Sequence, residues 1–261
     1  MYEAATDLAG TVMLTISQSG ASPDLLAVVS RAREAGAHIV ALVNAEHSAL
    51  AQLADELLPL HAGPERSVAA TKSYIASLSA IVQLVAAWSA DGALGAALEQ
   101  APKRLARAWQ LDWSLAAARL SKTNNLYVIG RGVGLGIAQE AALKLKETCA
   151  LHAEAVSAAE LRHGPMALVG AGFPLLVFSQ NDESRAGILA LAAELRAQGA
   201  QVLLAGAHVA NTLQLPTEEA HPVIEPLLFA QSFYRMANTL SLARGLDPDA
   251  PPHLRKVTET L

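Results

Sequence analysis

The sequence has little that would suggest a secreted, membrane-bound or nucleic-acid-binding protein. It contains one cysteine, Cys149, in 261 residues, which excludes an internal disulfide and fits a reducing compartment. No apolar run approaches the roughly 20 residues that a membrane span needs, and no basic stretch followed by an apolar one opens the chain. The net charge is −5 without a cluster of Lys and Arg, which argues against a nucleic-acid partner. We therefore expect a cytoplasmic protein with no nucleic-acid and no membrane partner.

The sequence is instead rich in apolar residues, which make up 52% of the chain against 16% charged residues. Such a composition allows a sizeable core and favours buried contact between subunits. Apolar patterns predict strands that alternate with helices, which is typical of parallel sheets covered on both faces. The expected strands are 11–17, 38–43, 57–60, 126–129, 175–178 and 201–204, and the expected helices are 23–35, 68–88, most of 91–120, 135–149, 185–198 and 227–244.

Two stretches of about equal length resemble each other. Residues 11–44 and 173–206 both have the order strand, Ser-Gln, helix, Gly-Ala, strand, so that Ser17 matches Ser179 and Gly36 matches Gly199 with one inserted residue. One interpretation is that strand–helix–strand units are common and look alike. The other is that the chain consists of two related α/β halves.

The stretch Ser17-Gln18-Ser19-Gly20-Ala21-Ser22 lies between a predicted strand and a predicted helix. Ser22 suits the N-cap and Pro23 the first helical position. Free backbone N–H groups and the helix dipole favour an anion at such a place, and three hydroxyls and an amide supply neutral donors for a phosphate. The alternative is an ordinary serine-capped turn.

A glycine-rich stretch, Gly130 to Gly136, follows another predicted strand. Its spacing does not match G-x-G-x-x-G, because Leu135 or Ile137 stands where the third glycine would be needed. We therefore expect no nicotinamide or flavin site here.

The segment from Gln139 to Pro165 is the richest in chemistry. On a helix, Glu140, Lys144 and Glu147 fall on one stripe, which in most proteins is a solvated row of charges. Here His152 and His163 follow closely, and a Glu with a His can supply a base and an acid near neutral pH. A metal site is not expected, since the histidines lack the spacing of metal ligands.

Four separated motifs together resemble the sugar isomerase (SIS) domain family, in particular the isomerase part of glucosamine–fructose-6-phosphate synthases and the stand-alone glucosamine-6-phosphate deaminases. The motifs are "SQSG", "VAATKS" (Val68–Ser73), "EAALKLKE…HAEA…AELRHGP" and the tail "LRKVTETL". The resemblance implies two tandem SIS domains, each a parallel sheet flanked by helices in three layers, of the flavodoxin or Rossmann type. The first, residues 1–110 with its linker helices, would be incomplete at its N terminus, and the second would be residues 111–261 with the tail.

The resemblance also implies which residues bind the substrate. The substrate phosphate would be held by Ser17, Gln18, Ser19 and Ser22, and Val68 would line the sugar.

The same resemblance implies catalytic roles. Glu147 would move a proton between C1 and C2, and Lys144 would lie near the sugar hydroxyls. His163 would open the sugar ring and would reach the site from the partner subunit of a homodimer. Lys256 aligns with the lysine that forms a Schiff base with the ketose in the synthases. Neither a metal nor another cofactor is required.

From this resemblance we expect conversion of glucosamine 6-phosphate to fructose 6-phosphate and ammonia. One alternative is the sugar-forming isomerase half of an aminotransferase, or another phosphosugar isomerase or deglycase. A second is a non-catalytic module that senses a sugar phosphate. The presence of both Glu147 and His163 favours an enzyme, and no basic helix-turn-helix segment is seen.

The repeat carries one further expectation about the start of the chain. In the second half, the strand and glycine loop at 126–136 precede the Ser179 turn, whereas only sixteen residues precede Ser17. The counterpart of the Gly130 loop would therefore lie upstream of Met1. We expect this form to expose apolar sheet surface and to have weakened or no activity unless another chain fills the gap.

Overall fold

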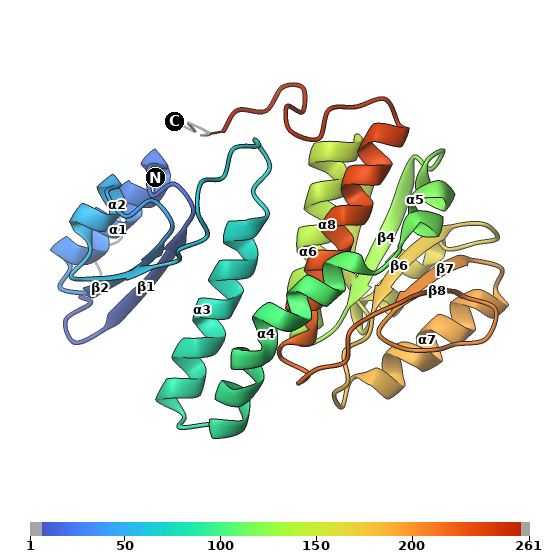
Figure 1. Ribbon diagram of the computed structural model, residues 1–261, viewed down its shortest axis with the longest axis horizontal. Helices are drawn as coiled ribbons and strands as arrows, with labels where there is room; N and C mark the ends of the chain where they lie inside the picture. The colour runs from blue at the N-terminus through green and yellow to red at the C-terminus, as the bar shows by residue number, and fades with distance from the viewer. Residues whose placement is uncertain (1–6, 257–261) are drawn as a thin grey trace. The chain divides into compact units, whose positions relative to one another are not determined.

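The computed structural model describes residues 7–256, and its contacts divide the chain into two compact units (Figure 1). One unit takes in the chain through Ile81 together with the tail from Pro252, and the other is Val82–Pro251. The final residues of the tail motif, 257–261, lie outside the described part. The family-domain bounds of 1–110 and 111–261 stay a prediction.

The first unit contains a parallel sheet of three strands in the order β1-β2-β3. Its elements are β1 (Val12–Ser17), α1 (Pro23–Glu34), β2 (His38–Val43), α2 (Ala49–Leu53) and β3 (Glu56–Pro59). Val29 of α1, Ile39 and Val43 of β2 and Leu50 of α2 are fully buried together, so α1 and α2 cover one face of the sheet. The three predicted strands are confirmed, whereas the short helix α2 was not expected.

The other face of β1 is apolar and open. Val12, Leu14 and Ile16 alternate with the inward-facing Met13 and Thr15, and they are 67%, 41% and 38% exposed. β1 is also an edge strand of its sheet.

The second unit contains a parallel sheet of five strands in the order β5-β4-β6-β7-β8. Its strands are β4 (Asn125–Gly130), β5 (His152–Ser157), β6 (Pro174–Phe178), β7 (Gln201–Ala205) and β8 (Leu213–Leu215). Strands β5 and β8 were not expected, because His152–Ser157 alternates weakly and β8 has only three residues.

Helices cover both faces of this sheet, which confirms the predicted three-layer arrangement (Figure 1). On one face lie α5 (Ser114–Leu120), α6 (Gly134–Cys149) and α8 (Glu225–Ala243), and on the other lies α7 (Arg185–Ala197). Leu175 and Val177 of β6 pack with Ile188 and Leu195 of α7. Phe178 points the opposite way and stacks on Phe229 of α8, with ring centroids 5.8 Å apart.

Two further α-helices are α3 (Lys72–Trp88) and α4 (Gly92–Gln110), and two short 3₁₀ helices are η1 (Glu160–His163) and η2 (Pro165–Leu168). Helix α3 begins four residues later than expected from the apolar pattern. The reason is local, since the carboxylate of Glu65 binds the backbone N–H groups of Thr71 and Ser73 and fixes the start there.

The two stretches that resemble each other in sequence have the same local structure. Each is a strand, a helix and a neighbouring parallel strand: β1-α1-β2 and β6-α7-β7. Gly36 and Gly199, which match in sequence, both take left-handed conformations, with φ of 94° and 91°, just after the helix. Both donate their backbone N–H to the carbonyl three residues earlier, at Arg33 and Arg196.

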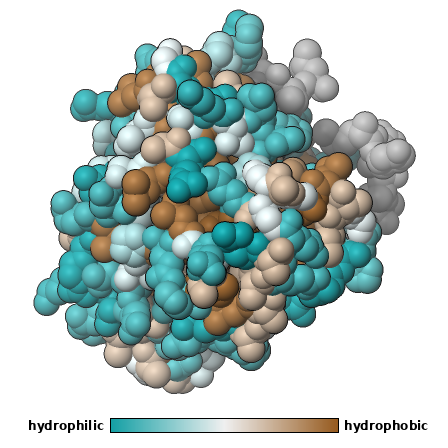
Figure 2. Space-filling model, turned by 90° about the vertical axis from the view of Figure 1, so that its right-hand side faces the viewer, coloured by the Kyte–Doolittle hydropathy of each residue, from teal (hydrophilic) through white to brown (hydrophobic). Residues whose placement is uncertain are grey.

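Within residues 7–256, no helix is both long and apolar enough to cross a membrane. Seen from the right-hand side of Figure 1, the surface is largely hydrophilic, with a patch of apolar side chains near the middle of the view (Figure 2).

Candidate active site

The serine-rich turn lies between β1 and α1, where the sequence predicts it. Ser17 ends β1, and its Oγ accepts a hydrogen bond of 3.0 Å from the N–H of Gly20. Ser19 Oγ accepts a longer one, 3.4 Å, from Ala21. Ser22 is the N-cap residue of α1, but its hydroxyl makes no capping hydrogen bond. The first turn of α1 therefore offers N–H groups, and the Ser22 hydroxyl remains available to a ligand.

The turn has a fixed shape because glycine is required at its centre. Gly20 has a φ of 59°, and a Cβ there would lie 2.2 Å from Oγ of Ser48. Ser48 in turn caps α2 by accepting the N–H of Ala51. Gln18 adds a backbone anchor, since its carbonyl accepts the N–H of Ala45 at 3.1 Å. These contacts hold the three serines in one small, partly exposed loop.

Val68 and Lys256 lie on neighbouring parts of the same unit. Lys256 Nζ donates to the carbonyl of Ser67 at 2.5 Å, so the ammonium lies beside the residue that precedes Val68. Val68 itself is half-buried. The sequence-predicted residues of the "VAATKS" motif and of the tail are thus brought together.

Glu65 is a residue of this region that sequence reasoning missed. Its Oε1 accepts the N–H of Ser73 at 2.7 Å, the hydroxyl of Ser73 at 2.9 Å and the N–H of Thr71 at 3.0 Å. Burial raises the pKa of the Glu65 carboxyl, but the hydrogen bonds from Ser73 and Thr71, with help from Lys256, bring it below its usual value. Glu65 is therefore an ionised cap of α3 and a counter-charge for Lys256.

In the second unit, the stripe on α6 is buried rather than solvated. The side chain of Lys144 is 6% exposed, and its Nζ lies 2.7 Å from Oε2 of Glu147 and 3.3 Å from Oε1 of Glu140. Glu140 is 8% exposed, whereas the Glu147 side chain is 23% exposed. An ammonium between two carboxylates, one of which reaches solvent, is an arrangement that can accept and return a proton. The interpretation as an exposed row of charges is wrong for Glu140 and Lys144.

The two histidines of this segment lie on different elements. His163 ends a short 3₁₀ turn, η1 (Glu160–His163), and its side chain is exposed. Leu161 anchors that turn in the core beside α7. His152 opens β5 and is also exposed. Among the described hydrogen bonds and ion pairs, none joins either histidine to Lys144 or Glu147.

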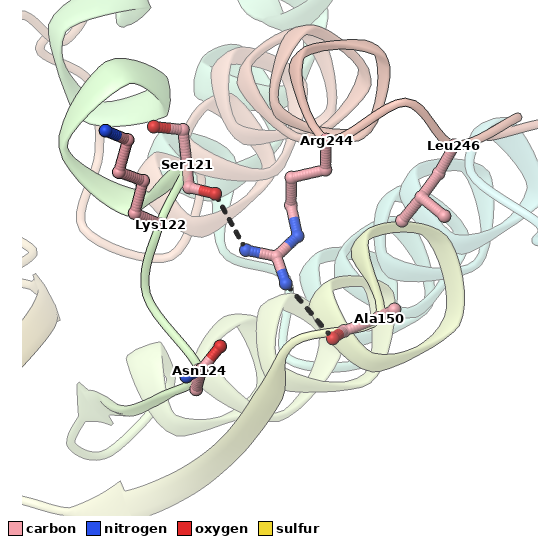
Figure 3. A pocket seen from close by; sticks show the side chains of 6 residues that line it. All are labelled: Ser121, Lys122, Asn124, Ala150, Arg244 and Leu246. Carbon is pink, nitrogen blue, oxygen red and sulfur yellow. Dashed lines mark hydrogen bonds between the residues drawn. The ribbon is translucent and has the colours of Figure 1, made fainter.

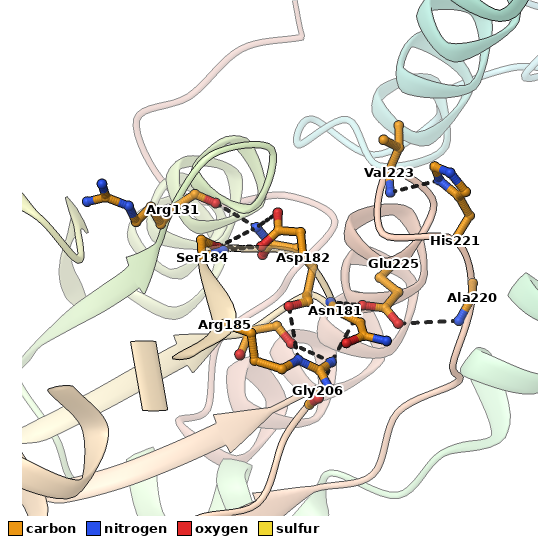
Figure 4. A network of polar contacts seen from close by, with 12 residues as sticks. Arg131, Asn181, Asp182, Ser184, Arg185, Gly206, Ala220, His221, Val223 and Glu225 are labelled. Atoms are coloured by element: carbon orange, nitrogen blue, oxygen red, sulfur yellow. Dashed lines mark hydrogen bonds and ion pairs between the residues drawn. The ribbon is translucent and has the colours of Figure 1, made fainter. Parts of the chain in front are cut away.

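The loop that matches the serine-rich turn in the second half is filled by its own side chains (Figure 4). The carboxylate of Asp182 accepts the N–H and the hydroxyl of Ser184 at 2.9 and 2.6 Å, and the Gln180 amide at 2.8 Å. Burial raises the pKa of Asp182, but these hydrogen bonds outweigh it, and the pKa lies below its usual value. A negative charge thus already occupies the loop before α7.

The glycine-rich stretch of 130–136 packs against this same loop. Gln180 donates to the carbonyl of Arg131 at 2.8 Å, and its Oε1 lies 2.2 Å from where a Cβ on Gly134 would be. A side chain at position 134 would therefore force the Gln180 amide to move. The buried Gln180 amide fills the turn where a dinucleotide-binding protein would hold its phosphates.

A pocket of about 310 Å³ lies where α5, α6 and α8 end (Figure 3). Its lining residues are Ser121, Lys122, Asn124, Ala150, Arg244 and Leu246. The guanidinium of Arg244 binds the carbonyls of Ser121 and Thr123 at 3.0 and 2.9 Å. Arg244 therefore donates hydrogen bonds to backbone carbonyls just after the end of α5, which is a structural role.

Two further observations concern metal ligands and the single cysteine. Between residues 7 and 256, no group of three or more His, Cys, Asp or Glu side chains is placed to hold a metal ion. Cys149 is fully buried, and burial raises the pKa of its thiol, so it is a poor nucleophile.

The chain is similar in sequence to a known protein family and similar in fold to its solved members. The model of the SIS domain matches residues 5–87 and 119–223, which cover most of both units.

Curated relatives are similar over almost the whole chain. A glutamine–fructose-6-phosphate aminotransferase (isomerizing) of Aeropyrum pernix is 35% identical over 266 residues, covering 94% of this chain. The enzyme of the same name from Methanothermobacter thermautotrophicus is 36% identical over 255 residues, again covering 94% of this chain. The chain spans 43% of the length of each of these relatives.

Solved structures show the same fold. A protein of Silicibacter pomeroyi assigned as a phosphosugar isomerase has a TM-score of 0.88 at 40% identity, over 94% of this chain and 76% of that one. The C-terminal domain of glucosamine-fructose-6-phosphate aminotransferase from Francisella tularensis has a TM-score of 0.79 at 26% identity, over 93% and 74% of the two chains. A glucosamine-6-phosphate deaminase of Thermotoga maritima, 22% identical, shares the fold with a TM-score of 0.77 over 96% and 76%.

Proposed function

The chain belongs to the SIS domain family, and on that premise we propose that it is a phosphosugar isomerase with two tandem SIS domains, which interconverts the aldose and ketose forms of a hexose 6-phosphate. The substrates we propose are fructose 6-phosphate and ammonia, which give the 2-amino aldose and water, as in the isomerase part of the aminotransferases that it resembles. The observation that carries the proposal is the Lys144–Glu147 pair, a carboxylate with an ammonium at 2.7 Å and partial access to solvent.

In this proposal Glu147 takes the proton from C2 of the open-chain aldose and returns it at C1. One carboxylate suffices, because C1 and C2 are adjacent and the proton stays on the same side. Lys144 stabilises the negative charge that develops on the sugar oxygens while the proton is on Glu147. A positioned acid–base group of this kind contributes about 10²–10⁴ in rate.

The serine-rich turn would hold the phosphate. Its hydroxyls from Ser17, Ser19 and Ser22 are neutral donors at a helix N-terminus, which suits a dianion. The matching loop of the second half is less suited to a phosphate, because the Asp182 carboxylate fills it by binding Ser184. Gln18 would add an amide donor, and Val68 would line the sugar.

Lys256 and His163 have roles that the family resemblance suggests. Lys256 would form an imine with the ketose, and its pairing with the Ser67 carbonyl keeps its Nζ in a partly buried place. His163 is exposed, which is compatible with a role in opening the sugar ring in the active site of a partner subunit of a homodimer.

Two candidate reactions differ in the direction of nitrogen transfer. In the isomerase half of an aminotransferase the nitrogen is added to the sugar, and the relatives favour this candidate. A deaminase, which releases ammonia from glucosamine 6-phosphate, is the second candidate. Cys149 is buried and burial raises the pKa of its thiol, so neither candidate gives it a catalytic role.

The test is a panel of neutral and amino sugar phosphates, incubated in deuterated water with and without ammonium. Isomerase activity would appear as deuterium at C1 or C2, and deaminase activity as ammonia released from glucosamine 6-phosphate. A non-catalytic sensor would bind a sugar phosphate without either change. No exchange and no binding with any member of the panel would refute the proposal.

A further inference from the structure

A row of four polar side chains crosses the interface between α6 and α8. The hydroxyl of Tyr234 on α8 donates to Oε1 of Glu140 at 2.7 Å. The Nζ of Lys144 lies 3.3 Å from the same oxygen, and 2.7 Å from Oε2 of Glu147. The row therefore joins a hydroxyl on one helix to the carboxylate to which the proposed function gives the proton transfer.

Three members of the row are buried, and the fourth, Glu147, reaches solvent. Tyr234 and Glu140 are 9% and 8% exposed, whereas the side chain of Glu147 is 23% exposed. The strands beneath α6 add no charge to the face that it covers, because the residues there alternate with those that face α7 and are apolar. They are Leu126 and Val128 of β4, Ala153 and Ala155 of β5, and Leu176 of β6. The charge state of Glu140 is therefore set by its burial and by the other members of the row.

Three groups act on the charge of Glu140: Lys144 and Glu147 from its own helix and Tyr234 from α8. Burial raises the pKa of Glu140 above its usual value, and the nearby Glu147 adds to this. The Lys144 ammonium and the Tyr234 hydroxyl oppose the rise. The hydroxyl of Tyr234 therefore helps to keep a buried carboxylate ionised.

We infer that Tyr234 is a positioning residue, which acts through Glu140 and Lys144 on the carboxylate of Glu147. While Glu140 is ionised, Lys144 is shared between two carboxylates. When Glu140 takes a proton, Glu147 is the one ionised partner of Lys144, and the undivided ammonium stabilises the Glu147 carboxylate more strongly, so that it takes a proton from the sugar less readily. Because it concerns Glu147, this inference rests on the proposed function.

The first test is the pH dependence of turnover in Tyr234→Phe. The ring and its packing remain, and only the hydroxyl is lost, so Glu140 takes up its proton at higher pH. We expect the acid limb of the kcat profile to move up by about one pH unit, as for a lost hydrogen bond to a buried charge. Turnover on that limb falls about tenfold, while KM and alkaline turnover stay close to wild type.

The matched control is Tyr127→Phe, which removes a hydroxyl from another buried tyrosine. Tyr127 is 4% exposed and packs on Phe173 on the opposite face of the sheet. Its profile should coincide with that of the wild type. Coincident profiles for Tyr234→Phe and wild type would overturn the inference.

A second test does not depend on activity. Carboxyl ¹³C signals of glutamate are titrated by NMR in wild type and Tyr234→Phe, with Glu140→Gln and Glu147→Gln to assign the two signals. A higher titration midpoint for Glu140, with a changed signal for Glu147, supports the inference even if no sugar phosphate turns over and the proposed function fails. Unchanged signals for both carboxyls in Tyr234→Phe would refute it, whatever the activity of the wild type.

Discussion

Lys144 and Glu147 form an ion pair of 2.7 Å on one face of α6, in which the ammonium is sheltered and the carboxylate reaches solvent. The difference follows from their positions on the helix. Lys144 lies under α8 and beside buried Glu140, whereas Glu147 is the next charged residue on that stripe toward the helix end. A base that keeps access to a substrate while its counter-charge is fixed is suited to transfer a proton repeatedly.

Replacing Glu147 with Gln should remove the base and keep the shape of the side chain. We expect kcat to fall by about 10²–10⁴ with little change in substrate affinity, because the lost group acts in the transition state. Exchange of the C2 hydrogen with solvent measures the step directly. Glu154→Gln on β5, an exposed glutamate, is the matched control and should keep full activity. Wild-type exchange in Glu147→Gln would remove this residue from the mechanism.

The serine-rich turn gives a second prediction, for binding. Ser17→Ala, Ser19→Ala and Ser22→Ala should each weaken sugar-phosphate binding, since a hydrogen bond to a charged group is worth about 1.5–3 kcal/mol. Ser22→Ala should leave the melting temperature almost unchanged, because its hydroxyl caps nothing in the free protein. Calorimetric titration with fructose 6-phosphate measures the affinity.

The matched control for this turn is Ser184→Ala in the second half. Ser184 binds Asp182 through both its N–H and its hydroxyl, so losing the hydroxyl should lower stability and leave phosphate affinity intact. An affinity loss in Ser184→Ala and none in the first turn would mean that the phosphate binds elsewhere.

The lowered pKa of Glu65 predicts that the free energy of unfolding depends on pH. Its pKa in the folded chain lies below the ordinary value of 4.5, so its stabilising effect is fully present above that value and is lost as the pH falls through the lower, folded value. Glu65→Ala should therefore destabilise the protein by about 1–2 kcal/mol near neutral pH, through loss of the α3 cap.

In acid, the melting temperatures of Glu65→Ala and wild type should converge. Glu34→Ala, which breaks an exposed pair with Arg31, is the control and should cost little at any pH. A constant difference between Glu65→Ala and wild type across the titration would show that the carboxylate charge is not involved.

Two glycines should respond in opposite directions to substitution by alanine. Gly20 has a φ of 59° and no space for a Cβ beside Ser48, so Gly20→Ala should destabilise the protein by at least about 1 kcal/mol. Gly95 lies inside α4 with nothing within 4 Å of an added Cβ, so Gly95→Ala should stabilise it by about 0.5–1 kcal/mol. Chemical denaturation measures both, and equal shifts of the same sign would contradict the structural argument.

The order of strands and helices was predictable from the sequence, because it depends on local signals. The runs before Ser17 and Phe178 are apolar and β-branched or bulky, and the helices that follow begin at residues suited to a helix start, such as Pro23. The same local signals placed the serine-rich turn at the end of β1. Strand β5 was not predicted from the sequence, because its apolar and polar residues alternate weakly and its partner β4 lies earlier in the chain.

The chemical state of the site was decided by the tertiary structure. The spacing of Glu140, Lys144 and Glu147 puts them on one stripe, but only the packing of α8 against α6 buries two of them. Tyr234 is 94 residues from Glu140, so no local pattern could pair them. Likewise, Lys256 meets Ser67 across 189 residues. Local sequence sets backbone preference and which residues share a face, whereas burial, which governs the cost of a charge, arises only when distant segments pack together.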